Sequence, residues 1–298
     1  MPFLLILLNL RSFHGKVFRM IAVFDACTLL NVIQVTLDEK YISFIRKVYG
    51  EFVIPLVVFT EMNQNKWKND TDSDHRDTID ELINKDLFRN IDHQAPVKET
   101  KFMIKVLGQI EQNGEFMCIG HALNKSREGK TDLGENLHKV HVFTDDMPAN
   151  SQFSEFYRSN LAGSILDSID LMTIFCLKGF ISFHDVIKYC NSLKLNYNRP
   201  ASVLIRAFKD YKENTSKVKS SKQDVILSSI IDVLTDFHDD VVDKMQNLIS
   251  KPEYKSLVGL PAFVQPMLGE FLKSNFRAKI PEINRRIYTL TKMVYEIK

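Results

Sequence analysis

Short apolar runs alternate with longer amphipathic stretches along the first half of the chain. The runs are rich in β-branched and aromatic residues, which is typical of strands buried on both faces. We expect strands at 21–24, 51–54, 87–91 and 138–144. The stretches between them carry apolar residues at helical spacing, and we expect helices at 27–50, 55–62, 70–86, 98–113 and 115–124. Strands that alternate with helices predict a parallel sheet covered by helices on both faces.

Beyond residue 161 the pattern is helical throughout. We expect helices at 166–177 and 183–195, a polar linker at 211–223, one long amphipathic helix at 224–250, and a last helix after Pro281. No internal repeat is found. The sequence therefore predicts three parts, which are a peripheral segment at 1–19, an α/β domain at 20–198 and an all-helical extension at 199–298. Deletion of 1–19 should leave a folded protein.

Composition narrows the choice of partners and location. The chain has 298 residues and a formal net charge of +2, so any nucleic-acid surface must be a local patch. The four cysteines are scattered in apolar surroundings without a Cys-x-x-Cys pair, and we expect reduced thiols that pack as small hydrophobes in a cytoplasmic protein. The apolar run at 3–10 is far shorter than the ~20 residues that span a bilayer, so we expect no membrane association.

Acidic residues lie at or near the ends of these apolar runs. Asp25 directly follows the first expected strand, Asp145 and Asp146 follow a later one, Glu61 lies in the helix after the second strand, and Glu115 follows Asn113-Gly114. The carboxyl ends of parallel strands meet at one edge of the sheet, where ligands bind. Carboxylates that converge there would repel one another without a cation, and their oxygens suit Mg²⁺ or Mn²⁺.

The segments around these acids resemble the PIN domain family, which includes many metal-dependent ribonucleases and the VapC toxins of toxin–antitoxin pairs. The similarity extends over roughly residues 20–195 and rests on the order and spacing of its motifs. The matching segments are 23–30, 54–61, 114–122, 142–146, and 161–166 with 177–181. The resemblance implies a three-layer α/β/α fold with a central parallel sheet, here followed by the helical extension.

The resemblance also implies roles for individual residues. Asp25, Glu115 and one of Asp145 and Asp146 resemble the metal ligands, and Glu61 resembles the second acid of the catalytic cluster. The implied activity is hydrolysis of RNA phosphodiester bonds by a Mg²⁺- or Mn²⁺-dependent endoribonuclease, with an antitoxin protein as partner if the protein is a toxin. Two departures from the family concern phosphate contacts: 147–150 lacks the usual basic residue, and Ser164 replaces a threonine.

Other interpretations stay open at this point. Each acid taken alone is explained by a structural role, such as Asp25 as a helix N-cap or Asp145-Asp146 as a turn. A PIN-like module that binds RNA or protein without catalysis is the main alternative. A haloacid dehalogenase-like phosphatase is disfavoured, because Cys27 stands where that family has the second aspartate of Asp-x-Asp. The extension could serve self-association, inhibitor binding or substrate clamping, and nothing in its sequence chooses among them.

Overall fold

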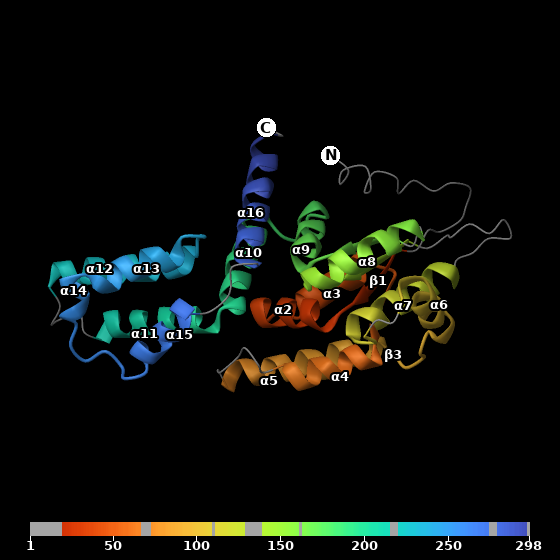
Figure 1. The fold of residues 1–298 in the computed structure, drawn as a ribbon, viewed down its shortest axis with the longest axis horizontal. Coiled ribbons are helices and arrows are strands. Elements are labelled where there is room, and N and C mark those ends of the chain that lie inside the picture. The colour runs from red at the N-terminus through yellow and green to blue at the C-terminus, as the bar shows by residue number, and fades with distance from the viewer. Residues whose placement is uncertain are drawn as a thin grey trace. The chain divides into compact units, whose positions relative to one another are not determined.

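The computed structural model describes residues 20–66, 73–108, 111–128, 139–160, 163–214, 220–273 and 279–296. The chain forms two compact units, one ending at Ser182 and the other beginning at Phe183 (Figure 1). This boundary precedes the one predicted after Asn198, because the helix that starts at Phe183 packs against helices of the second unit. The peripheral segment predicted at 1–19 lies outside the described residues.

Five parallel strands form one sheet in the first unit, in the order β3-β2-β1-β4-β5. They are β1 Met20–Phe24, β2 Glu51–Pro55, β3 Ile91–Asp92, β4 Lys139–Phe143 and β5 Gly163–Leu166. In β1, β2 and β4 every residue after the first is buried, which explains their nearly uninterrupted apolar sequences. The predicted α/β fold with a parallel sheet is confirmed.

Helices cover both faces of this sheet. They are α2 Ala26–Thr36, α3 Lys40–Val48, α4 Leu56–Asn65, α5 Ser73–Glu81, α6 Val97–Leu107, α7 Gly114–Glu128, α8 Met147–Ser159 and α9 Ser168–Leu177. The chain crosses from β1 to β2 through α2 and α3, and it crosses back in the opposite direction from β3 to β4 through α6 and α7. Because such crossovers are right-handed, the two pairs of helices lie on opposite faces. The unit therefore has three layers, helix on sheet on helix.

Two helices that the sequence predicts as continuous are interrupted. The helix predicted at 27–50 is divided at Leu37, and the helix predicted at 224–250 is divided at Phe237. Both residues adopt the left-handed conformation, with φ of 49° and 50°, and each donates its N–H to a carbonyl of the preceding turn. This helix ending usually requires glycine, so the prediction was wrong because no glycine marks either stop.

Smaller corrections concern short elements. The strand predicted at 87–91 is a 3₁₀ turn at Phe88–Asn90, preceded by a π-helical turn at Leu82–Leu87, and only Ile91–Asp92 pairs with β2. Strand β5 lies where the sequence was interpreted as helical. Its first residue must be glycine, because a Cβ on Gly163 would lie 1.9 Å from the carbonyl oxygen of Val140.

In the described part of the second unit the regular elements are all helices, as predicted. Its helices are α10 Phe183–Tyr197, α11 Arg199–Asn214, α12 Ser221–Asp236, α13 Val241–Ser250, α14 Pro252–Lys255, α15 Val264–Lys273 and α16 Lys279–Glu296. Helix α11 packs between α12 and α15 (Figure 1). Phe208, Leu227 and Phe271, one from each of these helices, are buried in their common core. Among the described residues of both units, no helix combines the length and the apolar character that a bilayer crossing requires.

Candidate functional site

The candidate site lies at the carboxyl edge of the sheet, between β1 and β4. The strand order reverses there, because β2 follows β1 on one side of it and β4 pairs with it on the other. Phe24 of β1 is aligned with Phe143 of β4, and their rings stack with centroids 4.8 Å apart. The N–H of Asp25 donates to the Phe143 carbonyl at 2.9 Å, which extends the pairing by one residue. Asp25 and Thr144 therefore leave the sheet side by side, at the position where open parallel sheets bind ligands.

Asp25 is almost fully buried, with 1% of its surface exposed. Its Oδ2 accepts hydrogen bonds from the Cys27 thiol at 2.6 Å and from the Thr144 hydroxyl at 3.3 Å. Although Asp25 occupies the N-cap position of α2, its carboxylate makes no capping hydrogen bond and, among the backbone N–H groups of that helix, accepts from that of Ala26. The structural explanation of Asp25 as an N-cap therefore does not account for its burial.

Gly114, the first residue of α7, lies between the carboxylates of Asp25 and Glu61. A Cβ at Gly114 would lie 2.5 Å from Oε2 of Glu61 and 3.3 Å from Oδ1 of Asp25, so glycine permits this close approach. The backbone N–H of Gly114 also donates a hydrogen bond to the Glu61 carboxylate. The thiol of Cys118 in α7 donates to the Phe24 carbonyl of β1 at 3.5 Å.

The electrostatics show that these acids influence one another. Burial raises the pKa of Asp25 to about 6, and the charges of Glu115 and Glu61 add to the rise, while the hydrogen bond from Cys27 opposes it. The pKa of Glu61 is also raised, first by burial and then by the charge of Glu115. Asp25, Glu61 and Glu115 thus form a cluster, here named the acidic cluster, in which negative charge is incompletely compensated.

The two aspartates after β4 are differently placed. Asp145 is buried, with Oδ1 accepting from the Ser168 N–H at 2.7 Å and Oδ2 accepting from the Asn31 amide at 2.5 Å. Asp146 is half-buried and caps α8, accepting from the Ala149 N–H at 3.5 Å. Asp145 therefore ties α2 to α9, and Asp146 begins α8.

Sequence reasoning missed the groups that connect these acids. Cys27 was interpreted as a small hydrophobe, but its thiol contacts Asp25 and also accepts the N–H of Asp145 at 3.2 Å. Burial, followed by the charges of Asp25 and Asp145, raises the pKa of the thiol well above its ordinary value, so it stays protonated as a donor. The sequence does place Cys27 two residues after Asp25, in the first turn of the helix, and this spacing was the one sign that the two side chains are in contact.

The donors near Asp25 suit a hard divalent cation in their chemistry, because carboxylate oxygens are the ligands of Mg²⁺ and Mn²⁺. Their present spacing is wider than coordination requires. Over the described ranges, no three His, Cys, Asp or Glu side chains are arranged to hold one ion. Binding would therefore require the longer side chains of Glu61 and Glu115 to move.

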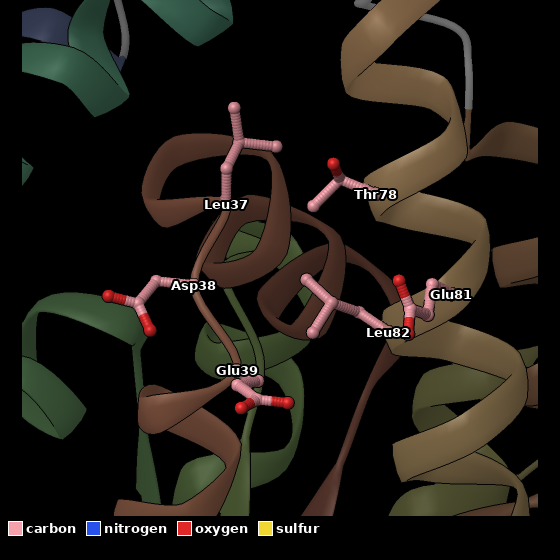
Figure 2. Close-up of a pocket in the computed structure, with 6 residues that line it drawn as sticks. All are labelled: Leu37, Asp38, Glu39, Thr78, Glu81 and Leu82. Carbon is pink, nitrogen blue, oxygen red and sulfur yellow. The ribbon is translucent and has the colours of Figure 1, made fainter.

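A surface hollow of about 260 Å³ lies between the α2–α3 turn and the end of α5, and none of its lining residues belongs to the acidic cluster (Figure 2). It is lined by Leu37, Asp38, Glu39, Thr78, Glu81 and Leu82. Asp38 is paired with Lys40 at 2.7 Å, and Glu81 with Lys85 at 3.2 Å. Two of its three carboxylates are thus compensated, unlike those of the acidic cluster.

Comparisons of the chain with protein-family models, with curated proteins and with solved structures find no match. The fold and the site define an α/β protein with a parallel sheet and an acidic cluster at its carboxyl edge. A functional assignment therefore rests on this geometry and on the sequence motifs.

Proposed function

We propose that the protein is a metal-dependent endoribonuclease of the PIN type, with its centre at the acidic cluster. One observation carries the proposal. Asp25 is buried beside Glu61 and Glu115, and its pKa is raised to about 6. A protein that needed this corner only for packing would have an apolar or amide side chain there, because uncompensated buried charge is costly.

A divalent cation would relieve this cost. Asp25 is held in place by its neighbours, while Glu61 and Glu115 extend from α4 and α7 on longer, rotatable side chains. Binding of Mg²⁺ or Mn²⁺ would draw these two glutamates towards Asp25. When bound, such an ion polarises a phosphodiester and lowers the pKa of a coordinated water. The chain itself supplies the fixed carboxylate and the buried wall behind it.

The substrate class comes from the order of the motifs. Segments 23–30, 54–61, 114–122 and 142–146 resemble PIN ribonucleases in sequence, and an RNA substrate is part of the proposal on that ground. Asp145 or Asp146 would contribute the last acid, as the resemblance implies. Asp146 is the more accessible of the two, because it is half-buried and its capping contact is long, at 3.5 Å.

A second candidate is a PIN-like module that binds RNA or protein without catalysis. It is favoured by the spacing of the acids, since no three potential ligands among the described residues are arranged around one ion. It is also favoured by Asp145, both of whose oxygens accept hydrogen bonds within the protein. This candidate predicts no response to divalent metal.

The test is cleavage of a mixed pool of structured RNAs in Mn²⁺, Mg²⁺ or EDTA. Wild type would be compared with Asp25→Asn, Glu115→Gln and Asp146→Asn, and with Glu81→Gln as the matched control from the surface hollow. We expect metal-dependent cleavage that is lost in Asp25→Asn, because the variant lacks the fixed carboxylate that would hold the ion, and is unchanged in Glu81→Gln. Cleavage that persists in both Asp25→Asn and Glu115→Gln would exclude this centre. Absence of both cleavage and Mn²⁺ binding in wild type would support the binding module.

A further inference from the structure

We propose that Cys27 is a positioning residue of the acidic cluster. Its thiol restrains the orientation of the Asp25 carboxylate, so that one oxygen faces Glu61, and it connects the end of β1 to the segment after β4. The role in metal binding rests on the proposed function, whereas the contact with Asp25 does not.

The thiol lies among three polar groups from two strand ends. It donates to Oδ2 of Asp25 at 2.6 Å, accepts from the N–H of Asp145 at 3.2 Å, and lies 3.7 Å from the hydroxyl oxygen of Thr144. A thiol can donate one hydrogen bond and accept another. One side chain in the first turn of α2 thus holds two segments that are distant in sequence.

This arrangement makes the two oxygens of Asp25 unequal. Oδ2 faces Cys27 and Thr144, while Oδ1 lies 3.3 Å from where a Cβ of Gly114 would be, towards Glu61. The terminal torsion of an aspartate has a broad preference. Besides the two donors on Oδ2, the backbone N–H of Ala26 also donates to the Asp25 carboxylate. These donors together set the carboxylate plane and direct Oδ1 towards the other acids, and Cys27 provides the shorter of the two side-chain contacts.

The competing explanation is that Cys27 only fills space in the core. A serine at this position distinguishes the two explanations. Serine keeps a donor and an acceptor at the same place, whereas alanine keeps neither. Cys118 offers a matched control. Its thiol is buried nearby in α7, but it donates to the Phe24 carbonyl and not to the Asp25 carboxylate.

The first experiment measures the Mn²⁺ dissociation constant by titration calorimetry for wild type, Cys27→Ala, Cys27→Ser and Cys118→Ala. Loss of a group that orients a metal ligand typically weakens binding about 10–100-fold, and we expect this for Cys27→Ala. Cys27→Ser and Cys118→Ala should stay within about threefold of wild type, since each keeps the donor to Asp25. Equal weakening in Cys27→Ala and Cys118→Ala, or no recovery in Cys27→Ser, would overturn the positioning role.

A second experiment needs no metal and separates the two proposals. Urea unfolding in EDTA gives a double-mutant cycle for Asp25→Ala and Cys27→Ala. We expect Cys27→Ala to raise the unfolding equilibrium constant at least about fivefold more in wild type than in the Asp25→Ala background. Additive effects would overturn the positioning role, whatever the metal result. Coupling in a wild-type protein that binds no Mn²⁺ would overturn the proposed nuclease while leaving the Cys27–Asp25 contact in place.

Discussion

A buried aspartate lies just beyond the end of each of the strands β1 and β4, and the two side chains are held in contrasting ways. Both oxygens of Asp145 accept hydrogen bonds, one from the Asn31 amide and one from a backbone N–H. Asp25 has a thiol and a hydroxyl on one oxygen, and two glutamates raise its pKa further. Burial of a carboxylate is therefore a poor sign of function by itself. Burial with incomplete compensation is the more informative observation.

Removal of Asp145, whose two oxygens both accept hydrogen bonds, should lower the stability more than any other change considered. Asp145→Ala leaves the Asn31 amide and the Ser168 N–H without their acceptor, and two hydrogen bonds to a charged group correspond to about 4 kcal/mol of lost stability. Asp145→Asn should cost about half as much, because its carbonyl oxygen can still accept one of them. Urea denaturation measures both values. A loss below about 1 kcal/mol for Asp145→Ala would show that Asp145 is not a structural tie.

Neutralisation of Asp25, whose charge is incompletely compensated, should instead raise the stability of the metal-free protein. The pKa of Asp25 in the folded protein, about 6, lies above its ordinary value of 3.8. Folding thus favours the protonated form, so metal-free wild type should lose stability as pH rises from about 4 to about 6. At about 1.4 kcal/mol per pKa unit, Asp25→Asn should be more stable than wild type by up to about 3 kcal/mol at pH 7.

The measurement is urea denaturation of both proteins in EDTA from pH 4 to pH 8. The two stabilities should converge near pH 4 and separate above it. Saturating Mn²⁺ should narrow the difference at pH 7, because an ion that binds only the folded wild type stabilises it. A variant that is less stable than wild type at pH 7 in EDTA would contradict this account of Asp25.

A methyl group at Gly114 should disturb the acidic cluster while leaving most of the stability intact. Its Cβ would lie 2.5 Å from the end of the Glu61 side chain, which can move away at small cost. We expect Gly114→Ala to change stability by less than about 1 kcal/mol and to weaken Mn²⁺ binding about tenfold. Gly269→Ala is the control, since nothing lies within 4 Å of its added methyl. Unchanged Mn²⁺ affinity in Gly114→Ala would exclude Glu61 from the centre.

The smallest effect is expected at Glu61 itself, which is only half-buried. Removal of its charge should lower the pKa of Asp25, because Glu61 contributes to the rise. Glu61→Gln should therefore displace the pH-dependent loss of stability towards lower pH, with a gain below about 1 kcal/mol at pH 7 after allowance for solvent screening. The same pH series in EDTA measures this shift. A stability loss that moves to higher pH in Glu61→Gln would contradict the prediction.

The sequence was sufficient for the strands that are buried on both faces. β1, β2 and β4 appear as apolar runs, and the parallel sheet follows from their alternation with helices. Strand β5 could not be found in this way, because three of its four residues are only half-buried. The breaks at Leu37 and Phe237 were equally hidden, since neither position carries the glycine that usually marks a left-handed helix end.

For the candidate site, the sequence supplied the acids but not their partners. Asp25 was identified from its position after β1, and parallel topology places it beside the residue that follows Phe143. The contacts of Asp145 depend on how α2 and α9 pack, and Asn31 and Ser168 have no distinguishing pattern in the sequence. The contact of Cys27 with Asp145 depends on strand register, which a local pattern cannot supply.

The pairing of β1 with β4 also has a consequence for the time course of folding. Asp25 meets Thr144 only after more than a hundred residues have been drawn into a closed loop, and closure of long loops slows the folding of parallel sheets. In the second unit α11 packs on α12, α12 on α13 and α13 on α14, and each of these contacts joins helices that are consecutive in the chain, which favours rapid folding. Stopped-flow refolding should therefore show helical signal before Mn²⁺ affinity appears. The acidic cluster would then assemble late, after most of the helical structure of the chain has formed.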